Sequence, residues 1–169
     1  MLRLIVALSV ASTLFASSAG AETASASNKA KAAIDACLTR FAETDQRECI
    51  GAYSDACMKS PDGQTTYGMT DCLTEESDAW DAILNERYQA RMTDAKELDK
   101  DRAEWDSTTS EAAKTLRAAQ RAWVAFRDAE CDRIFELNKD GTIRLPETAS
   151  CLNRLTAERA LALAGNENF

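Results

Sequence analysis

An apolar stripe at helical spacing runs through the middle of this 169-residue chain and constrains its fold more than any other feature. Apolar residues recur every four positions between about residues 71 and 98: Trp80, Leu84, Tyr88 and Met92, with Ile83 and Ala95 widening the stripe. Charged residues occupy the other faces. The pattern predicts a long amphipathic helix that needs a partner surface.

A second stripe follows between residues 110 and 137, in steps of three and four: Ala112, Leu116, Ala119, Trp123, Phe126 and Ile134. Thr108 and Glu111 form a capping-box pattern at its start. The polar stretch 99–108 between the two stripes is expected to fray or turn. Two long amphipathic helices with a short polar connection are predicted to pack antiparallel.

The rest of the chain also has a helical pattern. Residues 29–41 and 46–58 predict a helical hairpin, and the turn residues from Ser60 to Gly63 open a loop that continues to about Thr70. A last helix is expected from about Pro146 to Ala164, with Gly165 as its cap. We therefore predict an all-α fold: a small, disulfide-stapled helical bundle dominated by a long antiparallel helix pair.

The N-terminus has the pattern of a secretory signal peptide. Arg3 precedes an apolar run, and small residues close the segment, so we expect cleavage after Ala21. Residues 22–28 are expected to be flexible and residues 29–165 to form a single domain. No later segment approaches the apolar length that a membrane span requires. The expected location is the periplasm or the extracellular medium.

The chain is acidic, with a formal net charge of −8. Loss of residues 1–21 would remove Arg3 alone among the charged residues and leave 19 basic and 28 acidic side chains. Such a surface repels nucleic acid and would attract a cationic partner at low salt. The same acidity is also typical of a surface that only keeps an exported protein in solution.

The six cysteines are even in number, which in an exported protein predicts disulfides. Six cysteines allow 15 pairings. No CxxC motif occurs, so neither a redox pair nor a zinc knuckle is indicated.

The sequence does not indicate an enzyme. It contains no histidine, and it lacks both a GxSxG motif and a glycine-rich phosphate loop. The acid pairs Glu75–Glu76 and Asp99–Asp101 could resemble a glycosidase dyad, but carboxylates in an acidic helical domain mostly form solvated faces. The segment from Asn138 to Thr142 echoes a calcium loop without its full spacing. We expect no catalytic residue, metal or cofactor.

Polar residues accompany both long stripes. Gln120, Arg127 and Asp128 flank Trp123, while Asn85 and Tyr88 hold corresponding places on the first helix. If these faces meet, hydrogen bonds among them would fix the register of the two helices. A ligand-binding role is the alternative.

These residues carry a resemblance to a known family. Leu84-Asn85 followed by Tyr88, then AQRAWVAFRDAEC at 119–131, then Cys151-Leu152 with Thr156 and Arg159, resemble the LprI-like N-terminal domain family, named after a mycobacterial lysozyme inhibitor. The resemblance covers roughly residues 49–164. It implies a small, disulfide-bonded helical domain exported to the cell envelope.

The resemblance also implies a disulfide between Cys131 and Cys151, and a turn at Asp140-Gly141 is consistent with it. For the other four cysteines, the helical hairpin favours Cys37 with Cys49 and leaves Cys57 with Cys72. The motif residues are expected to be structural: Asn85, Tyr88, Gln120, Trp123, Arg127, Asp128, Thr156 and Arg159.

The function that the resemblance implies is binding of lysozyme or another cationic muramidase, with inhibition by occlusion of the catalytic cleft. Exposed acidic positions in segments 60–70 and 99–108 are the expected contacts. A disulfide-linked carrier of lipid or small ligands, as in saposins, is one alternative, although the cysteine spacing of that group is absent. A module for envelope assembly is another.

Overall fold

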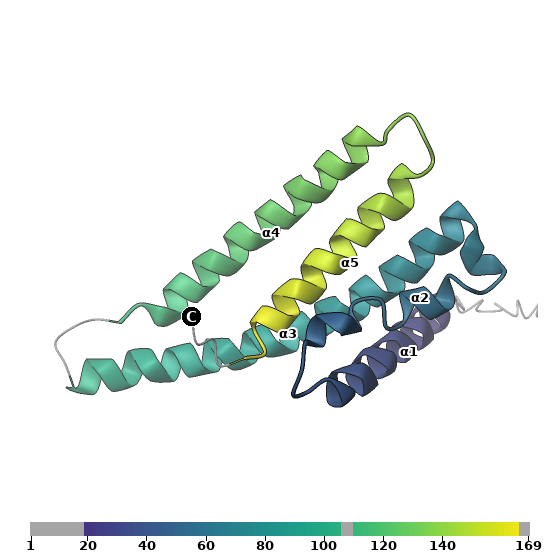
Figure 1. The fold of residues 1–169 in the computed structure, drawn as a ribbon. Helices are drawn as coiled ribbons and strands as arrows, with labels where there is room; N and C mark the ends of the chain where they lie inside the picture. The colour runs from purple at the N-terminus through teal and green to yellow at the C-terminus, as the bar shows by residue number, and fades with distance from the viewer. Residues whose placement is uncertain (1–18, 106–109, 166–169) are drawn as a thin grey trace, which may run out of the picture.

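The computed structural model describes residues 19–105 and 110–165, and these residues form an all-α bundle without a strand (Figure 1). The predicted fold class is therefore confirmed. The elements, in chain order, are α1 (Ala19–Arg40), the 3-10 turn η1 (Gln46–Cys49), α2 (Ser54–Cys57), the 3-10 turn η2 (Asp62–Gln64), α3 (Thr66–Trp105), α4 (Ala112–Leu137) and α5 (Arg144–Ala162).

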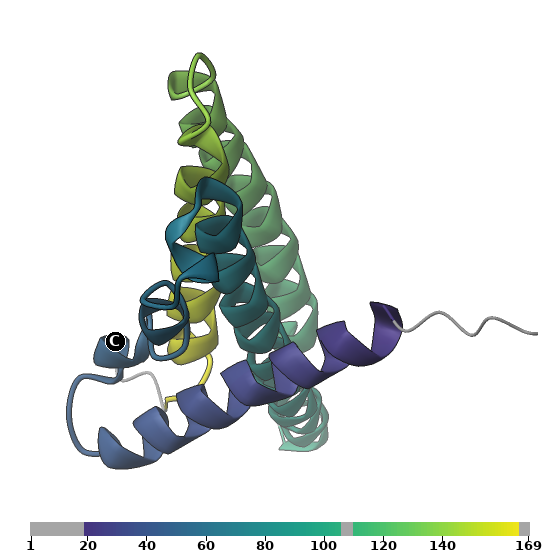
Figure 2. The same cartoon turned by 90° about the vertical axis from the view of Figure 1, so that its right-hand side faces the viewer.

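Helix α5 lies at the centre of the arrangement. α3 packs mostly against α5, α4 runs antiparallel beside α5, and the direct contact between α3 and α4 is smaller (Figure 1). The strongest partner of α3 is thus the last helix, whereas the sequence predicted α4. Helix α1 crosses the direction of the other long helices and packs on α3 (Figure 2).

The core is built on the first half of α3, as its stripe predicted. Trp80 is fully buried, and Ile83, Leu84 and Met92 are also buried. Ile34 of α1 and Ala157 and Ala160 of α5 pack against this face. Burial of a large apolar side chain contributes about 1.5–3 kcal/mol, so these contacts hold α1, α3 and α5 together.

Helix α4 is mainly exposed, and this differs from the predicted core stripe. Phe126 is 55% exposed, and Cys131 is the one buried residue of the helix. Trp123 is half-buried and packs at the edge of the core. Helix α4 has neighbouring helices on one side only, and its apolar stripe extends beyond the surface that they cover.

Several predicted boundaries also differ. Residues 22–28, expected to be flexible, belong to α1. Helix α3 begins at Thr66 and continues through the polar stretch to Trp105, so that stretch is helical as far as the structure describes it. Thr108 of the expected capping box lies outside the described residues. Glu111 forms no side-chain cap, and the Asp99 carboxylate instead accepts hydrogen bonds from the amides of Ala112 and Ala113 at 2.7 and 3.0 Å.

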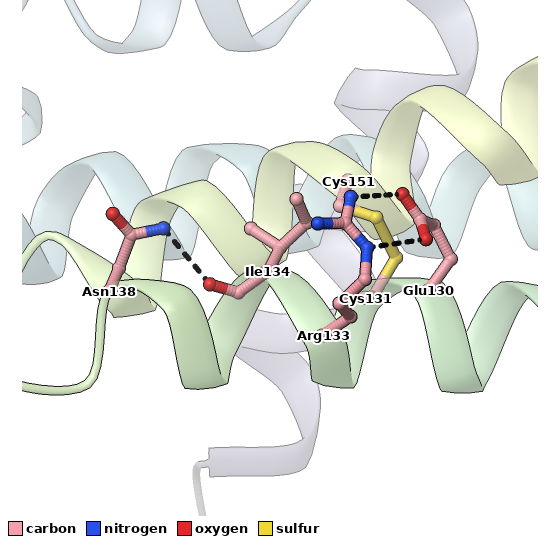
Figure 3. A network of polar contacts seen from close by, with 6 residues as sticks. All are labelled: Glu130, Cys131, Arg133, Ile134, Asn138 and Cys151. Atoms are coloured by element: carbon pink, nitrogen blue, oxygen red, sulfur yellow. Dashed lines mark hydrogen bonds and ion pairs between the residues drawn. A yellow bond between two sulfur atoms is a disulfide. The ribbon is translucent and has the colours of Figure 1, made fainter.

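The three disulfides of the structure join the same pairs that the sequence analysis favoured: Cys37–Cys49, Cys57–Cys72 and Cys131–Cys151. The first connects α1 to η1, the second connects α2 to α3, and the third connects α4 to α5. Figure 3 shows the third, with the ion pair between Glu130 and Arg133 beside it at 2.6 Å. Further along α4, the Asn138 side chain donates to the carbonyl of Ile134, which ends the helix in a simple turn where the sequence echoed a calcium loop.

Candidate protein-binding surface

A buried carboxylate organises one end of the molecule. Glu76 on α3 is fully buried, and its oxygens accept hydrogen bonds from the backbone amides of Gly51, Tyr53 and Ser54 at 2.7, 3.0 and 2.7 Å. The side chains of Trp80 and Asn153 donate to the same carboxylate, each at 3.2 Å. Glu76 therefore ties the segment before α2 to both α3 and α5.

This carboxylate explains why residues 46–58 do not form the single helix that the sequence predicted. Between η1 and α2, three amides point at Glu76, so they cannot all continue a helix. Gly51 has a φ of 100°, and a Cβ atom there would lie 2.9 Å from the Asp55 carboxylate. Only glycine adopts such a backbone conformation readily.

The segment that follows, residues 57–72, is closed by a disulfide and is called here the Cys57–Cys72 loop. Its own side chains hold its backbone: Ser60 Oγ accepts from the Gly63 amide at 3.1 Å, and Thr65 Oγ1 accepts from the Gly68 amide at 2.9 Å. The backbone is also closely packed, because a Cβ atom at Gly68 would lie only 1.9 Å from the carbonyl oxygen of Asp62. The disulfide, these hydrogen bonds and the close packing therefore restrain the conformation of this loop.

The loop forms part of an acidic surface. A pocket of about 380 Å³ is lined by the loop and by the start of α3, including the carboxylates of Asp62, Asp71 and Glu75. Tyr67 also lines this pocket and is 71% exposed. An exposed aromatic ring beside carboxylates is a combination that suits contact with a basic protein surface.

The acidic surface continues along α3. Asp71, Glu75, Asp78 and Asp81 lie on one side of its first turns, and these four residues are called here the acidic ridge. Lysine and arginine form ion pairs with carboxylates of α1, the later turns of α3, α4 and α5, but within the described chain none pairs with the ridge. The ridge is thus a row of negative charge that the fold does not neutralise.

The surroundings of Asp78 disfavour its ionised form. Burial, and then the charges of Asp81 and Glu75, raise the pKa of Asp78. At the edge of the ridge, the Tyr53 hydroxyl donates to Glu75 at 2.5 Å. Burial, together with this hydrogen bond and the charge of Glu75, raises the pKa of Tyr53 to about 12. A cationic partner that pairs with the ridge would favour the ionised form of Asp78.

The two glutamates that the sequence offered as an acid pair have different surroundings. Glu76 is fully buried and hydrogen-bonded, while Glu75 lines the acidic pocket and accepts a hydrogen bond from Tyr53. The described residues also contain no group of three or more acidic or cysteine side chains arranged to hold a metal ion.

Five of the eight motif residues of the family resemblance lie together elsewhere, on α4 and α5. Arg159 on α5 donates to Gln120 on α4 at 3.0 Å, and the guanidinium groups of Arg159 and Arg127 lie 6.0 and 5.2 Å from the ring centre of Trp123. Arg127 pairs with its neighbour Asp128, so it does not bridge to α3.

The other three motif residues have separate places. Thr156 is buried, and Tyr88 packs at the edge of the core. Asn85 is exposed and donates to Asp81 on its own helix, so it does not join a seam with α4. The polar seam therefore connects α4 to α5, and it leaves out the side of α3 that the sequence had assigned to it.

Comparison with known proteins identifies the family. The model of the LprI lysozyme inhibitor family matches residues 57–163, which include the Cys57–Cys72 loop, the ridge and the α4–α5 seam. The chain belongs to this family. Helix α1 and the Cys37–Cys49 disulfide lie outside the matched region.

Two uncharacterized bacterial proteins are similar to this chain. R02472 of Rhizobium meliloti (strain 1021) is 28% identical over 118 residues, which cover 68% of this chain and 85% of the relative. YecT of Escherichia coli (strain K12) is 32% identical over 92 residues, which cover 54% of this chain and 55% of the relative. No solved structure matches the chain.

The family is one of inhibitors, and together with the three disulfides it indicates a protein that resides outside the cytoplasm. Within the described residues, every helix is too short or too polar to cross a bilayer.

Proposed function

We propose that this protein binds and inhibits a lysozyme-type muramidase, with the acidic ridge and the Cys57–Cys72 loop as the contact surface. Family membership supports the partner class. The ridge is the observation that carries the choice of surface, because a row of carboxylates that pairs with no lysine or arginine of the described chain suits a cationic enzyme. Residues 1–21 would act as the signal peptide, and residues 29–165 would be the domain that binds.

The mechanism that we propose is occlusion of the catalytic cleft. The ridge would attract the basic surface of the enzyme, and the loop with Tyr67 would cover the cleft in which glycosidases hold their catalytic carboxylates. The restrained conformation of the loop supports this role, since a preorganised loop loses little conformational entropy on binding. This surface includes Asp62, the one acidic position of the segment 60–70 that the sequence analysis expected to take part in contacts.

The direct experiment is a lysis assay. Purified protein from residue 22 onward is added to lysozyme with peptidoglycan as substrate, at low and at high salt. We expect inhibition at micromolar protein that weakens as salt increases, because the contact is electrostatic. A second assay with a soluble oligosaccharide substrate distinguishes inhibition of the enzyme from masking of the cell wall. An absence of inhibition at low salt in both assays would contradict the proposal.

A further inference from the structure

Helix α4 has an exposed apolar face that no other element of the described chain covers. The helix packs on α5 and, to a smaller extent, on α3, and it lies along one edge of the molecule (Figure 1). Phe126 of this helix is 55% exposed. Four alanines on the same side are also exposed: Ala118, Ala122, Ala125 and Ala129. Phe126 and these four alanines are called here the α4 outer face.

The alanines have the spacing of a contact between two helices. They follow one another in steps of four, three and four residues, which is the repeat that places a row of side chains against a second helix in a coiled coil. Since each of these side chains is a single methyl group, another helix can approach the row closely. The exposed side of α4 therefore suits contact with a helix.

The charges beside the alanine row indicate that this helix is α4 of a second copy. Arg121 and Asp128 lie on the same flank of the row, one on each side of its midpoint. Two copies of α4 can pack antiparallel with Ala122 of each against Ala125 of the other. In this register, Arg121 of each copy lies against Asp128 of the other. Arg121 forms no ion pair within the described residues, and Asp128, whose side chain is 54% exposed, pairs only with its neighbour Arg127.

The same register also fits the opposite flank and the ends of the row. It places Phe126 of each copy against Ala119 of the other, and Ala119 is exposed in the single chain. At the ends of the row, Glu111 and Glu136 are each paired with a lysine of their own chain, at 2.6 and 2.7 Å. In a parallel pair, by contrast, Arg121 would lie against Phe126 and have no acidic partner. The face is thus complementary to itself, as a two-fold dimer requires.

We propose that the protein forms an antiparallel homodimer through the α4 outer face. Contact along one helix of each copy buries little surface, so the dimer should be weak, with a Kd on the order of 10–100 µM. The contact shares no residue with the acidic ridge or the Cys57–Cys72 loop, and it does not rest on the proposed inhibition of lysozyme. A dimer of this kind would carry two acidic ridges.

Sedimentation equilibrium of the exported chain, from residue 22 onward, tests the dimer at about 0.15 M salt. We expect the native protein to change from monomer to dimer between about 5 and 500 µM. Ala125→Glu places a charge in the middle of the contact and should raise the Kd by at least about tenfold. The matched control Ala103→Glu, at an exposed alanine of α3 outside the contact, should leave the Kd unchanged.

Charge exchange tests the antiparallel register. Arg121→Asp and Asp128→Arg each set like charges against one another in the homodimer, so each should raise the Kd about tenfold. A mixture of these two variants pairs opposite charges at both positions and should associate at least as well as the native protein.

Three results would overturn the proposed dimer: a native protein that stays monomeric up to about 500 µM, an Ala125→Glu variant that dimerises as the native protein does, or a mixture of the two charge variants that does not associate. At concentrations where both are monomeric, Ala125→Glu and the native protein should inhibit lysozyme equally. The dimer and the inhibition can therefore fail separately.

Discussion

The two ends of α3 carry similar residues but are built differently. Each has carboxylates and an exposed aromatic ring, Tyr67 at the start and Trp105 at the end. At 40 residues the helix is about 60 Å long, so a contact at one end lies far from the other. A disulfide, a buried carboxylate and a hydrogen-bonded loop fix the first end, whereas α3 after Met92 has no buried residue.

Exposed charge alone therefore does not indicate a binding surface. At the second end, Lys100 lies 3.8 Å from Glu104, and Asp99 caps α4, so two of its carboxylates have a role within the fold. At the first end the ridge has no basic partner within the described residues, although burial and then the charges of Asp81 and Glu75 raise the pKa of Asp78. The ridge, whose charges have no basic partner within the described residues, is therefore a stronger indication of a binding surface than the carboxylates at the second end.

The largest expected effect comes from removal of the carboxylate that anchors the first end. Glu76→Ala leaves buried amides without an acceptor and should lower the free energy of unfolding by about 3–5 kcal/mol. The adjacent Glu75→Ala loses one hydrogen bond from Tyr53 and should cost about 1 kcal/mol. Urea denaturation of both variants measures the difference. Equal losses would contradict the role that we assign to Glu76.

The second prediction compares two disulfides and separates their effect on stability from the effect of loop order on inhibition. The double substitution Cys57→Ser with Cys72→Ser removes a disulfide between residues 15 positions apart and should lower the free energy of unfolding by about 3 kcal/mol. The matched double substitution Cys131→Ser with Cys151→Ser removes a disulfide between residues 20 positions apart and should lower it by about the same amount. At a temperature where both variants stay folded, only the first should lose inhibition of lysozyme. Equal inhibition by the two variants would show that the order of the loop is irrelevant.

A more local effect is expected at the second end. Hydrogen bonds from Ser110 and from the amides of Ala113 and Ala112 lower the pKa of Asp99. The stabilisation by this cap is therefore present at neutral pH and is lost only as pH falls below the usual carboxyl range. Asp99→Ala should speed hydrogen exchange at the Ala112 and Ala113 amides at pH 7, with lysozyme inhibition unchanged. Unchanged exchange would mean that the cap does not hold the start of α4.

The smallest expected effect on stability has the opposite sign. Because the folded state raises the pKa of Asp78, the ionised carboxylate destabilises the fold above its usual pKa, and this cost disappears in acid, where the group is protonated. Asp78→Asn should therefore raise Tm by about 1 °C at pH 7, with no gain near pH 3. The same variant should inhibit lysozyme less well. A lower Tm at pH 7 would contradict the like-charge cost along the ridge.

Much of the fold could be predicted from periodicity and cysteine spacing. The stripe through Trp80 and Leu84 is buried as expected, because a regular four-residue step in a long segment leaves little ambiguity. The stripe of α4 was less informative, since periodicity shows which face of a helix is apolar but not how much of that face a neighbour covers. Phe126 is exposed for this reason.

The candidate site was harder to predict. Segment 60–70 was expected on charge alone, but Glu75 and Glu76 look equivalent in the sequence, and their opposite environments arise from the packing of α2 and α5. The acidic ridge could have been found from the spacing of Asp71, Glu75 and Asp78, which places them on one helix face. That no lysine or arginine of the described chain pairs with the ridge depends on where each of these side chains lies, and that requires the structure.

We propose that the first end of α3, and not the second, contacts the cationic enzyme. Affinity for lysozyme at low salt tests this in two variants that each lose two negative charges: Asp71→Asn with Asp78→Asn on the ridge, and Glu97→Gln with Asp101→Asn near the second end. We expect the ridge variant to bind about fivefold to tenfold more weakly and the second variant to bind like the native protein. Equal losses, or a larger loss in the second variant, would contradict the account.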